Sequence, residues 1–107
     1  MQKIYISGGI TNVPNYEENF SRAERRLKEQ GFEVVNPCEI SKRLEETLKK
    51  SFNQEPTYKE YMIEDITELG RCDAIYMLNN WEKSKGACLE KHFAEVIGLD
   101  IMFEEII

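Results

Sequence analysis

The chain has 107 residues, a formal net charge of −6 and a hydrophobic content of 41%. These values predict one domain with a single core, and they argue against binding to DNA or RNA, which needs a basic surface. No apolar run approaches the ~20 residues that a membrane-spanning helix requires, and the N-terminus lacks the layout of a signal peptide. We therefore expect a cytoplasmic protein with no nucleic-acid partner and no membrane partner.

The three cysteines, Cys38, Cys72 and Cys88, are odd in number and widely spaced, with no CxxC pair. This pattern indicates reduced thiols rather than a disulfide framework or a zinc site. The single histidine, His92, cannot build a metal cluster by itself. We expect neither a metal nor any other cofactor.

The first third of the chain predicts two strands with a helix between them. Residues 3–7 read as a short strand, which leads into the glycine-led loop GGITNVPN. Apolar residues then recur at helical spacing from Tyr16 to Leu27, and Gly31 ends this helix. Residues 32–36 form the second expected strand, closed by a proline.

The remaining segments continue the alternation of helices and strands. Residues 39–50 predict a polar helix or a lid, and a second helix is expected from about 57 to 69. A third strand is expected at 73–78 and a fourth at 99–103, with a helix at about 84–97 between them.

Strands that alternate with helices imply a parallel sheet. We expect a three-layer α/β domain, flavodoxin-like or Rossmann-like, with four to five parallel strands flanked by helices. Ligands bind such sheets at the carboxyl ends of the strands, near the point where the strand order reverses. The loops after the first and third strands, together with the start of the helix at 84, converge on that edge.

Several residues at this edge are candidates for a site, and each also has a purely structural interpretation. Ser7, Gly8 and Gly9 allow close backbone approach to a ligand, or simply form a tight turn. Asp65 borders an apolar helix face, where its pKa would be raised, or it is a solvated carboxylate. Ile10 in the first loop completes this group.

The helix at 84 supplies a second group of candidates. Ser84 is either an N-cap or a phosphate ligand, and Gly86 costs a helix about 1 kcal/mol relative to alanine unless a ligand lies against it. Glu90 falls on or beside the buried face, where a carboxylate is costly unless it is hydrogen-bonded. Asn79 and Trp81 lie in the preceding loop, where Trp81 either stacks on a base or closes the core.

Two long segments, KIYISGGITNVPNYEENFSRAERRLKEQGFEVVNP and CDAIYMLNNWEKSKGACLEKHFAEVIGL, resemble the DUF4406 family. That family is a small branch of the nucleoside 2-deoxyribosyltransferase-like fold. The resemblance covers nearly the whole chain, so we expect residues 1–107 to form one domain of this type.

The chain also resembles the deoxynucleoside 5′-monophosphate N-glycosidases in three short motifs. These are Tyr-x-x-Gly in the first strand, two aspartates eight positions apart, and Ser-x-Gly-x-x-x-Glu. The matching residues are Tyr5 and Gly8; Asp65 and Asp73; and Ser84, Gly86 and Glu90.

This second resemblance implies an activity and a role for each residue. Glu90 would be the nucleophile that attacks C1′ of a deoxyribose and forms a covalent glycosyl-enzyme, and Asp65 would be the acid or would orient Glu90. Ser84 and Gly86 would hold a 5′-phosphate, while Gly8 and Gly9 would line the sugar pocket.

The chain departs from these patterns in its ligand-facing loops. Proline is common in the family at the position of Gly9, and Thr11 supplies no charge to a phosphate where the glycosidases carry a basic or polar residue. The alternative function is therefore a non-catalytic nucleotide-binding protein, a sensor or a sequestering protein, on the same fold. A flavodoxin-like electron carrier is disfavoured, because no phosphate loop rich in Ser and Thr follows the first strand.

The expected partner is a small-molecule nucleoside or nucleotide. A small chain with a site near its surface often needs a second copy to close the pocket, so a homodimer or a higher homo-oligomer is also expected.

Overall fold

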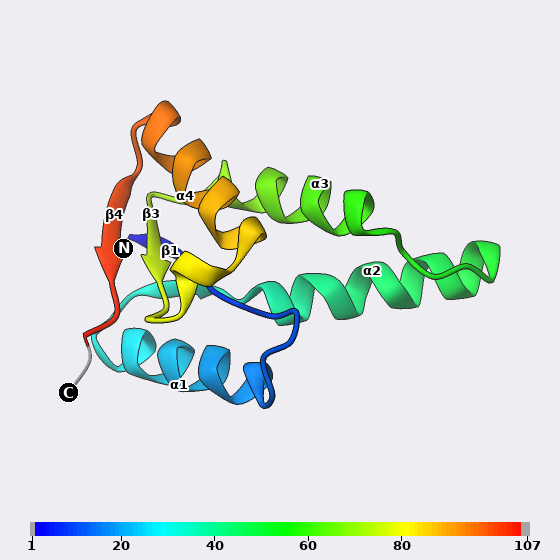
Figure 1. Cartoon of the computed structure of the whole chain (residues 1–107), viewed down its shortest axis with the longest axis horizontal. Helices are drawn as coiled ribbons and strands as arrows, with labels where there is room; N and C mark the ends of the chain where they lie inside the picture. Colours follow the sequence, from blue (N-terminus) through cyan, green and yellow to red (C-terminus); the bar gives the residue numbers. More distant parts are fainter. Residues whose placement is uncertain (1, 106–107) are drawn as a thin grey trace.

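A computed structural model describes residues 2–105 of the chain. One or two helices follow each strand as far as the last one, as Figure 1 shows. In chain order the elements are β1 (Lys3–Ser7), α1 (Tyr16–Glu29), β2 (Glu33–Val35), α2 (Pro37–Phe52), α3 (Tyr58–Leu69), β3 (Ala74–Met77), the 3₁₀ turn η1 (Trp81–Lys83), α4 (Lys85–Ile97) and β4 (Asp100–Phe103).

The four strands form one parallel sheet in the order β2-β1-β3-β4. This order corresponds to the first four strands of the doubly wound arrangement 2-1-3-4-5. The expectation of a three-layer α/β fold with four to five parallel strands is confirmed, with four strands in the described part of the chain. The strand order reverses between β1 and β3, so a crevice opens beyond the carboxyl ends of these two strands.

Helices cover both faces of the sheet (Figure 1). On one face, α1 packs Phe20 and Leu27 against Ile4 and Ile6 of β1. On the other face, residues of α2, α3 and α4 pack against Tyr5 and the facing side chains of β3. Successive side chains of a strand point to opposite faces, so the side chain of Ser7 points to the same face as that of Tyr5, toward α4.

The start of α2 differs from the sequence prediction. The helix begins at Pro37, two residues earlier than expected, because Pro is well suited to the first turn of a helix. Asn36 caps it: its Oδ1 accepts a hydrogen bond from the backbone N–H of Cys38 at 2.9 Å. The stretch expected to be a polar helix or a lid is thus a regular helix of 16 residues.

Helices α2 and α3 form a hairpin that extends away from the sheet (Figure 1). Only Pro37 and Ile40 of α2 are buried, both at the end of the helix near the sheet, while Phe52 at its outer end is exposed. The base of this hairpin forms one wall beside the crevice. No helix within residues 2–105 is long and apolar enough to cross a membrane.

Gly8 allows the chain to leave β1 close to the core, because a Cβ atom there would lie 2.6 Å from Cδ1 of the buried Leu78. We expect Gly8→Ala to lower the free energy of unfolding by about 1–3 kcal/mol through overpacking, measured by urea denaturation. Gly70→Ala is the control, because its added Cβ would meet nothing closer than 3.5 Å and should change stability by at most about 0.5 kcal/mol. Equal losses in the two variants would contradict this account.

Candidate active site

A cavity of about 1070 Å³ lies at the carboxyl ends of β1 and β3, between the α2–α3 hairpin and the start of α4. Its volume lies just above the ~300–1,000 Å³ typical of small-molecule sites. The sequence-predicted residues that line it are Gly8, Gly9, Ile10, Asp65, Ser84, Gly86 and Glu90. The convergence of the first loop, the third loop and the helix at 84 is therefore present in the structure.

Glu90 lies one turn inside α4 and is only 6% exposed. Two hydroxyl groups of β1 hold its carboxylate: Tyr5 donates to Oε2 at 2.6 Å, and Ser7 donates to Oε1 at 2.7 Å. Burial raises the pKa of Glu90 to about 7, although these two hydrogen bonds lower it in part. These two hydrogen bonds fix the position of the Glu90 side chain, which lines the cavity.

Asp65 on α3 is the second buried carboxylate of the cavity, and it is 7% exposed. Its Oδ1 is fully buried and has no hydrogen-bond partner within residues 2–105. Burial, followed by the negative charge of Glu90, raises the pKa of Asp65 to about 8. A buried polar atom without a partner is rare in folded proteins, so Asp65 brings an uncompensated polar atom to the edge of the cavity.

The loops that follow β1 and β3 are held against each other at the cavity. The Oδ1 atom of Asn80 accepts a hydrogen bond from the backbone N–H of Gly9 at 3.0 Å. A Cβ atom on Gly9 would lie 3.1 Å from Val13 and 3.3 Å from the amide nitrogen of Asn80. A side chain at this position would therefore have to displace these two neighbours by a few tenths of an ångström.

Ser84 and Gly86 form the start of α4 at the cavity wall. Ser84 is the N-cap, and its Oγ accepts a hydrogen bond from the backbone N–H of Ala87 at 3.1 Å. A Cβ on Gly86 would lie 3.4 Å from the hydroxyl of Tyr58. The N-cap interpretation of Ser84 is thus confirmed, and the free N–H groups of a first helical turn also suit an anion.

Four predicted site residues lie outside the cavity lining. Tyr5 and Ser7 are completely buried and contact Glu90 rather than the cavity. Asn79 is exposed, and Trp81 packs beside Phe103 with ring centroids 6.0 Å apart. Trp81 also contacts the core, which is the second of its two predicted roles.

Asp73, the second aspartate of the eight-residue spacing, also lies away from the cavity. Its Oδ2 accepts a hydrogen bond from the backbone N–H of Lys3 at 2.8 Å, at the amino ends of β1 and β3. Asp73 therefore joins the amino ends of β1 and β3, at the opposite end of these strands from the cavity.

The cavity contains residues that the sequence reasoning did not identify. Asn80 lines it in place of its neighbour Asn79, and the hairpin contributes aromatic, sulfur-containing and charged side chains. These are Cys38, Lys42, Glu45, Tyr58, Tyr61 and Met62. The hydroxyl of Tyr61 donates to Glu45 at 2.6 Å, which raises the pKa of Tyr61 to about 12. Tyr61 and Met62 lie within one turn of Asp65, which is the signal that could have identified them.

Lysines supply positive charge that the loop after β1 lacks. Lys83 and Lys85 flank Ser84 at the cavity, and Lys42 lines it from α2. Within residues 2–105, no cluster of three or more His, Cys, Asp or Glu side chains is arranged to hold a metal ion.

The fold and the site define an α/β protein with a small-molecule cavity at the switch point of its sheet. The family described as a domain of unknown function, DUF4406, matches residues 2–103. The chain belongs to this family. No curated protein matches the chain at a significant level.

We expect Asp65→Asn to stabilise the protein at neutral and alkaline pH. The pKa of Asp65 rises from 3.8 to about 8 on folding, so the folded protein holds a proton that the unfolded chain releases. Stability is therefore lost as the pH rises from about 4 to about 8, and the asparagine, which does not titrate, avoids this loss. At pH 8 the gain in unfolding free energy should be on the order of 2 kcal/mol, and it should shrink toward pH 4.

Thermal unfolding of both proteins between pH 4 and pH 9 measures this difference. Glu46→Gln is the control, because Glu46 is an exposed glutamate on α2 that does not contribute to the raised pKa of Asp65. A gain that does not depend on pH would show that Asp65 is not buried as described.

Proposed function

We propose that the protein is an N-glycosidase or deoxyribosyltransferase that acts on a deoxynucleoside or a deoxynucleoside 5′-monophosphate through a covalent glycosyl-glutamate. One observation carries this proposal: two buried carboxylates, Glu90 and Asp65, share one nucleotide-sized cavity but have different environments. Glu90 accepts two hydroxyl hydrogen bonds, whereas Oδ1 of Asp65 has no partner among the described residues.

The two environments support different roles. Hydrogen bonds from Tyr5 and Ser7 favour the ionised form of Glu90, which a nucleophile requires. Oδ1 of Asp65 receives no such bond among the described residues, and burial together with the negative charge of Glu90 raises the pKa of Asp65 to about 8, which favours its protonated form near neutral pH. Pairs of carboxyl groups with separated pKa values are typical of acid and nucleophile pairs in glycosidases.

The proposed reaction has two steps. A Glu90 oxygen forms a bond to C1′ while the bond from C1′ to the base nitrogen breaks, and Asp65 donates its proton to the departing base. Water or a second base then attacks C1′, the bond to Glu90 breaks, and Asp65 takes up the proton of the incoming group. A carboxylate has about four lone-pair sites, so Glu90 can attack while the hydroxyls of Tyr5 and Ser7 remain bound.

The start of α4 supports a 5′-phosphate on the substrate. Its free backbone N–H groups and positive dipole end favour an anion, and Lys83, Lys85 and Lys42 line the same cavity. These lysines supply the charge that Thr11 cannot. Tyr58 and Tyr61 of the hairpin also line the cavity and offer aromatic surface for a base.

We expect Glu90→Gln to abolish release of free base. Loss of the nucleophile of such a pair lowers kcat by at least about 10³-fold, because the covalent route is removed. The assay incubates the protein with the common deoxynucleosides and their 5′-monophosphates, with and without a second base, and separates the products by chromatography. Glu95→Gln on the exposed side of the same helix is the matched control and should retain full activity.

The outcomes of this assay separate the candidate functions. Free base alone indicates hydrolysis, and base exchange indicates transfer. Tight binding of a nucleotide that is recovered intact would reject the catalytic proposal and leave the non-catalytic nucleotide-binding protein.

We expect the activity to depend on pH as a bell-shaped curve with its maximum between about pH 7 and pH 8. Below this range Glu90 is protonated and cannot attack, and above it Asp65 has lost the proton that the base needs. Tyr5→Phe removes one hydrogen bond to the Glu90 carboxylate and should move the acidic limb of kcat/KM upward by roughly one pH unit. The alkaline limb should stay in place, and a shift of both limbs together would contradict the separate roles.

A cytoplasmic location and a homodimer or higher homo-oligomer stay predictions of the sequence. Light scattering of the purified protein checks the second, and a purely monomeric protein would contradict it.

A further inference from the structure

Glu104 is a buried carboxylate that lies outside the cavity lining. It follows β4 at the start of the C-terminal segment, and its side chain is only 3% exposed. A buried carboxylate destabilises a protein unless charged or polar groups compensate it. Its partners therefore indicate what this burial accomplishes.

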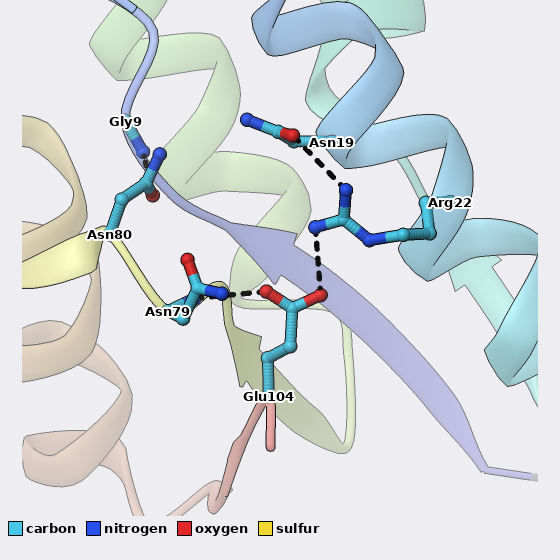
Figure 2. Close-up of polar contacts among 6 residues, drawn as sticks. All are labelled: Gly9, Asn19, Arg22, Asn79, Asn80 and Glu104. Carbon is cyan, nitrogen blue, oxygen red and sulfur yellow. Dashed lines mark hydrogen bonds and ion pairs between the residues drawn. The ribbon is translucent and has the colours of Figure 1, made fainter. Parts of the chain in front are cut away.

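The carboxylate joins three segments that are distant in the sequence (Figure 2). Oε2 accepts a hydrogen bond from the guanidinium of Arg22 on α1 at 3.1 Å, and Oε1 accepts one from the backbone N–H of Asn79 at 3.1 Å. Arg22 also donates to Oδ1 of Asn19 at 3.1 Å, so a second contact orients its guanidinium. The backbone N–H of Glu104 donates to the carbonyl of Met77 at 2.8 Å.

Asn79 lies two residues beyond the end of β3, where the hydrogen bonds between the strands have ended. The backbone N–H of Leu78 still pairs with the carbonyl of Ser7 at 2.8 Å, but the register of β1 with β3 ends at Ser7 and Met77. A backbone N–H at such a position needs another acceptor. Glu104 supplies that acceptor for Asn79.

The next residue transmits this constraint to the cavity. Asn80 follows Asn79 directly, and its Oδ1 accepts the backbone N–H of Gly9 at 3.0 Å. Both Asn80 and Gly9 line the cavity. A continuous path therefore runs from Glu104 through the backbone of Asn79 to Asn80 and Gly9, and Figure 2 shows all of its members.

We propose that Glu104 is a positioning residue, which fixes the loop after β3 and, through Asn80, holds the loop after β1 in the shape of the substrate pocket. This role in catalysis rests on the proposed function, but the positioning itself is a property of the fold. Glu104 thus supports the loops that line the cavity without lining the cavity itself.

Glu104→Ala should affect substrate binding more than the chemical step, because Glu104 and the two carboxylates of the cavity lie on different elements. Asp65 and Glu90 lie on α3 and α4, and Glu90 is held by β1 hydroxyls that do not depend on Glu104. Loss of Glu104 should therefore loosen the pocket around the substrate and leave the carboxylate pair in place. In a protein with base-release activity, Glu104→Ala should raise KM by about tenfold and lower kcat by less than about threefold.

The decisive measurement does not need activity. Amide–water exchange by NMR on the full chain reports the hydrogen bonds of Gly9 and Asn79 directly. In Glu104→Ala, both amides should exchange at least about tenfold faster than in the wild type, while the amides of the β1–β3 ladder stay protected. Glu105→Ala is the matched control, because it removes the same charge from the exposed next residue and should leave Gly9 unchanged.

A second variant keeps the test valid if Glu104→Ala does not fold. Glu104→Gln has the same shape but only one acceptor oxygen for two donors, so exchange at Gly9 should lie between that of the wild type and that of the alanine variant. Unchanged exchange at Gly9 in a folded Glu104 variant would overturn the proposal. A wild-type protein that releases no base would refute the glycosidase or transferase function, and the exchange rates at Gly9 and Asn79 would still decide the role of Glu104.

Discussion

The hydrogen bonds from Tyr5 and Ser7 to Glu90 are the interaction on which the rest of the site depends. They connect the central strand of the sheet to the helix that packs on it. The donors alternate along β1 so that both point to the same face, while Ile4 before them and Ile6 between them point to the other core. The regular geometry of one short strand thus determines where the carboxylate lies. Burial and the negative charge of Glu90 raise the pKa of the Tyr5 hydroxyl well above its usual value, so it remains a donor.

This arrangement places two acids where folding alone would not favour them. Burial raises the pKa of both Glu90 and Asp65, and Asp65 receives no hydrogen bond to its Oδ1 within the described chain to compensate. Buried carboxylates that destabilise the fold are typical of functional sites, because a core selected only for stability would place apolar side chains at these positions. Well-packed layers on both faces of the sheet supply the stability that offsets this destabilisation.

Much of the fold could be predicted from the sequence, because the signals are periodic. Alternation of apolar strands and amphipathic helices defines the parallel sheet, and the switch-point rule brings the loop after β1 together with the start of α4. Glu90 and Asp65 could be identified because each placed a charge beside an apolar helix face. The extent of α2 was less predictable, since the sequence alone did not show that Pro37 would begin the helix rather than only end the strand.

The remaining features depend on tertiary geometry that no local pattern encodes. A loop has no period, so the choice between Asn79 and Asn80 as the cavity residue could not be made from the sequence. Trp81 had two plausible environments, and the position of Phe103 decides between them. The role of Glu104 depends on Arg22, which lies 82 residues away, and a pairing over this distance leaves no trace in either segment.

The hairpin of α2 and α3 has a consequence for motion. Parts of a protein with few buried apolar contacts open at a lower free energy than the core, and α2 buries only Pro37 and Ile40. Asp65 belongs to this hairpin, whereas Glu90 is tied to the central strand. The position of Glu90 is therefore fixed by side-chain hydrogen bonds to the sheet, whereas the position of Asp65 depends on how α3 packs. Local opening is therefore expected first at the outer end of the hairpin, away from the sheet.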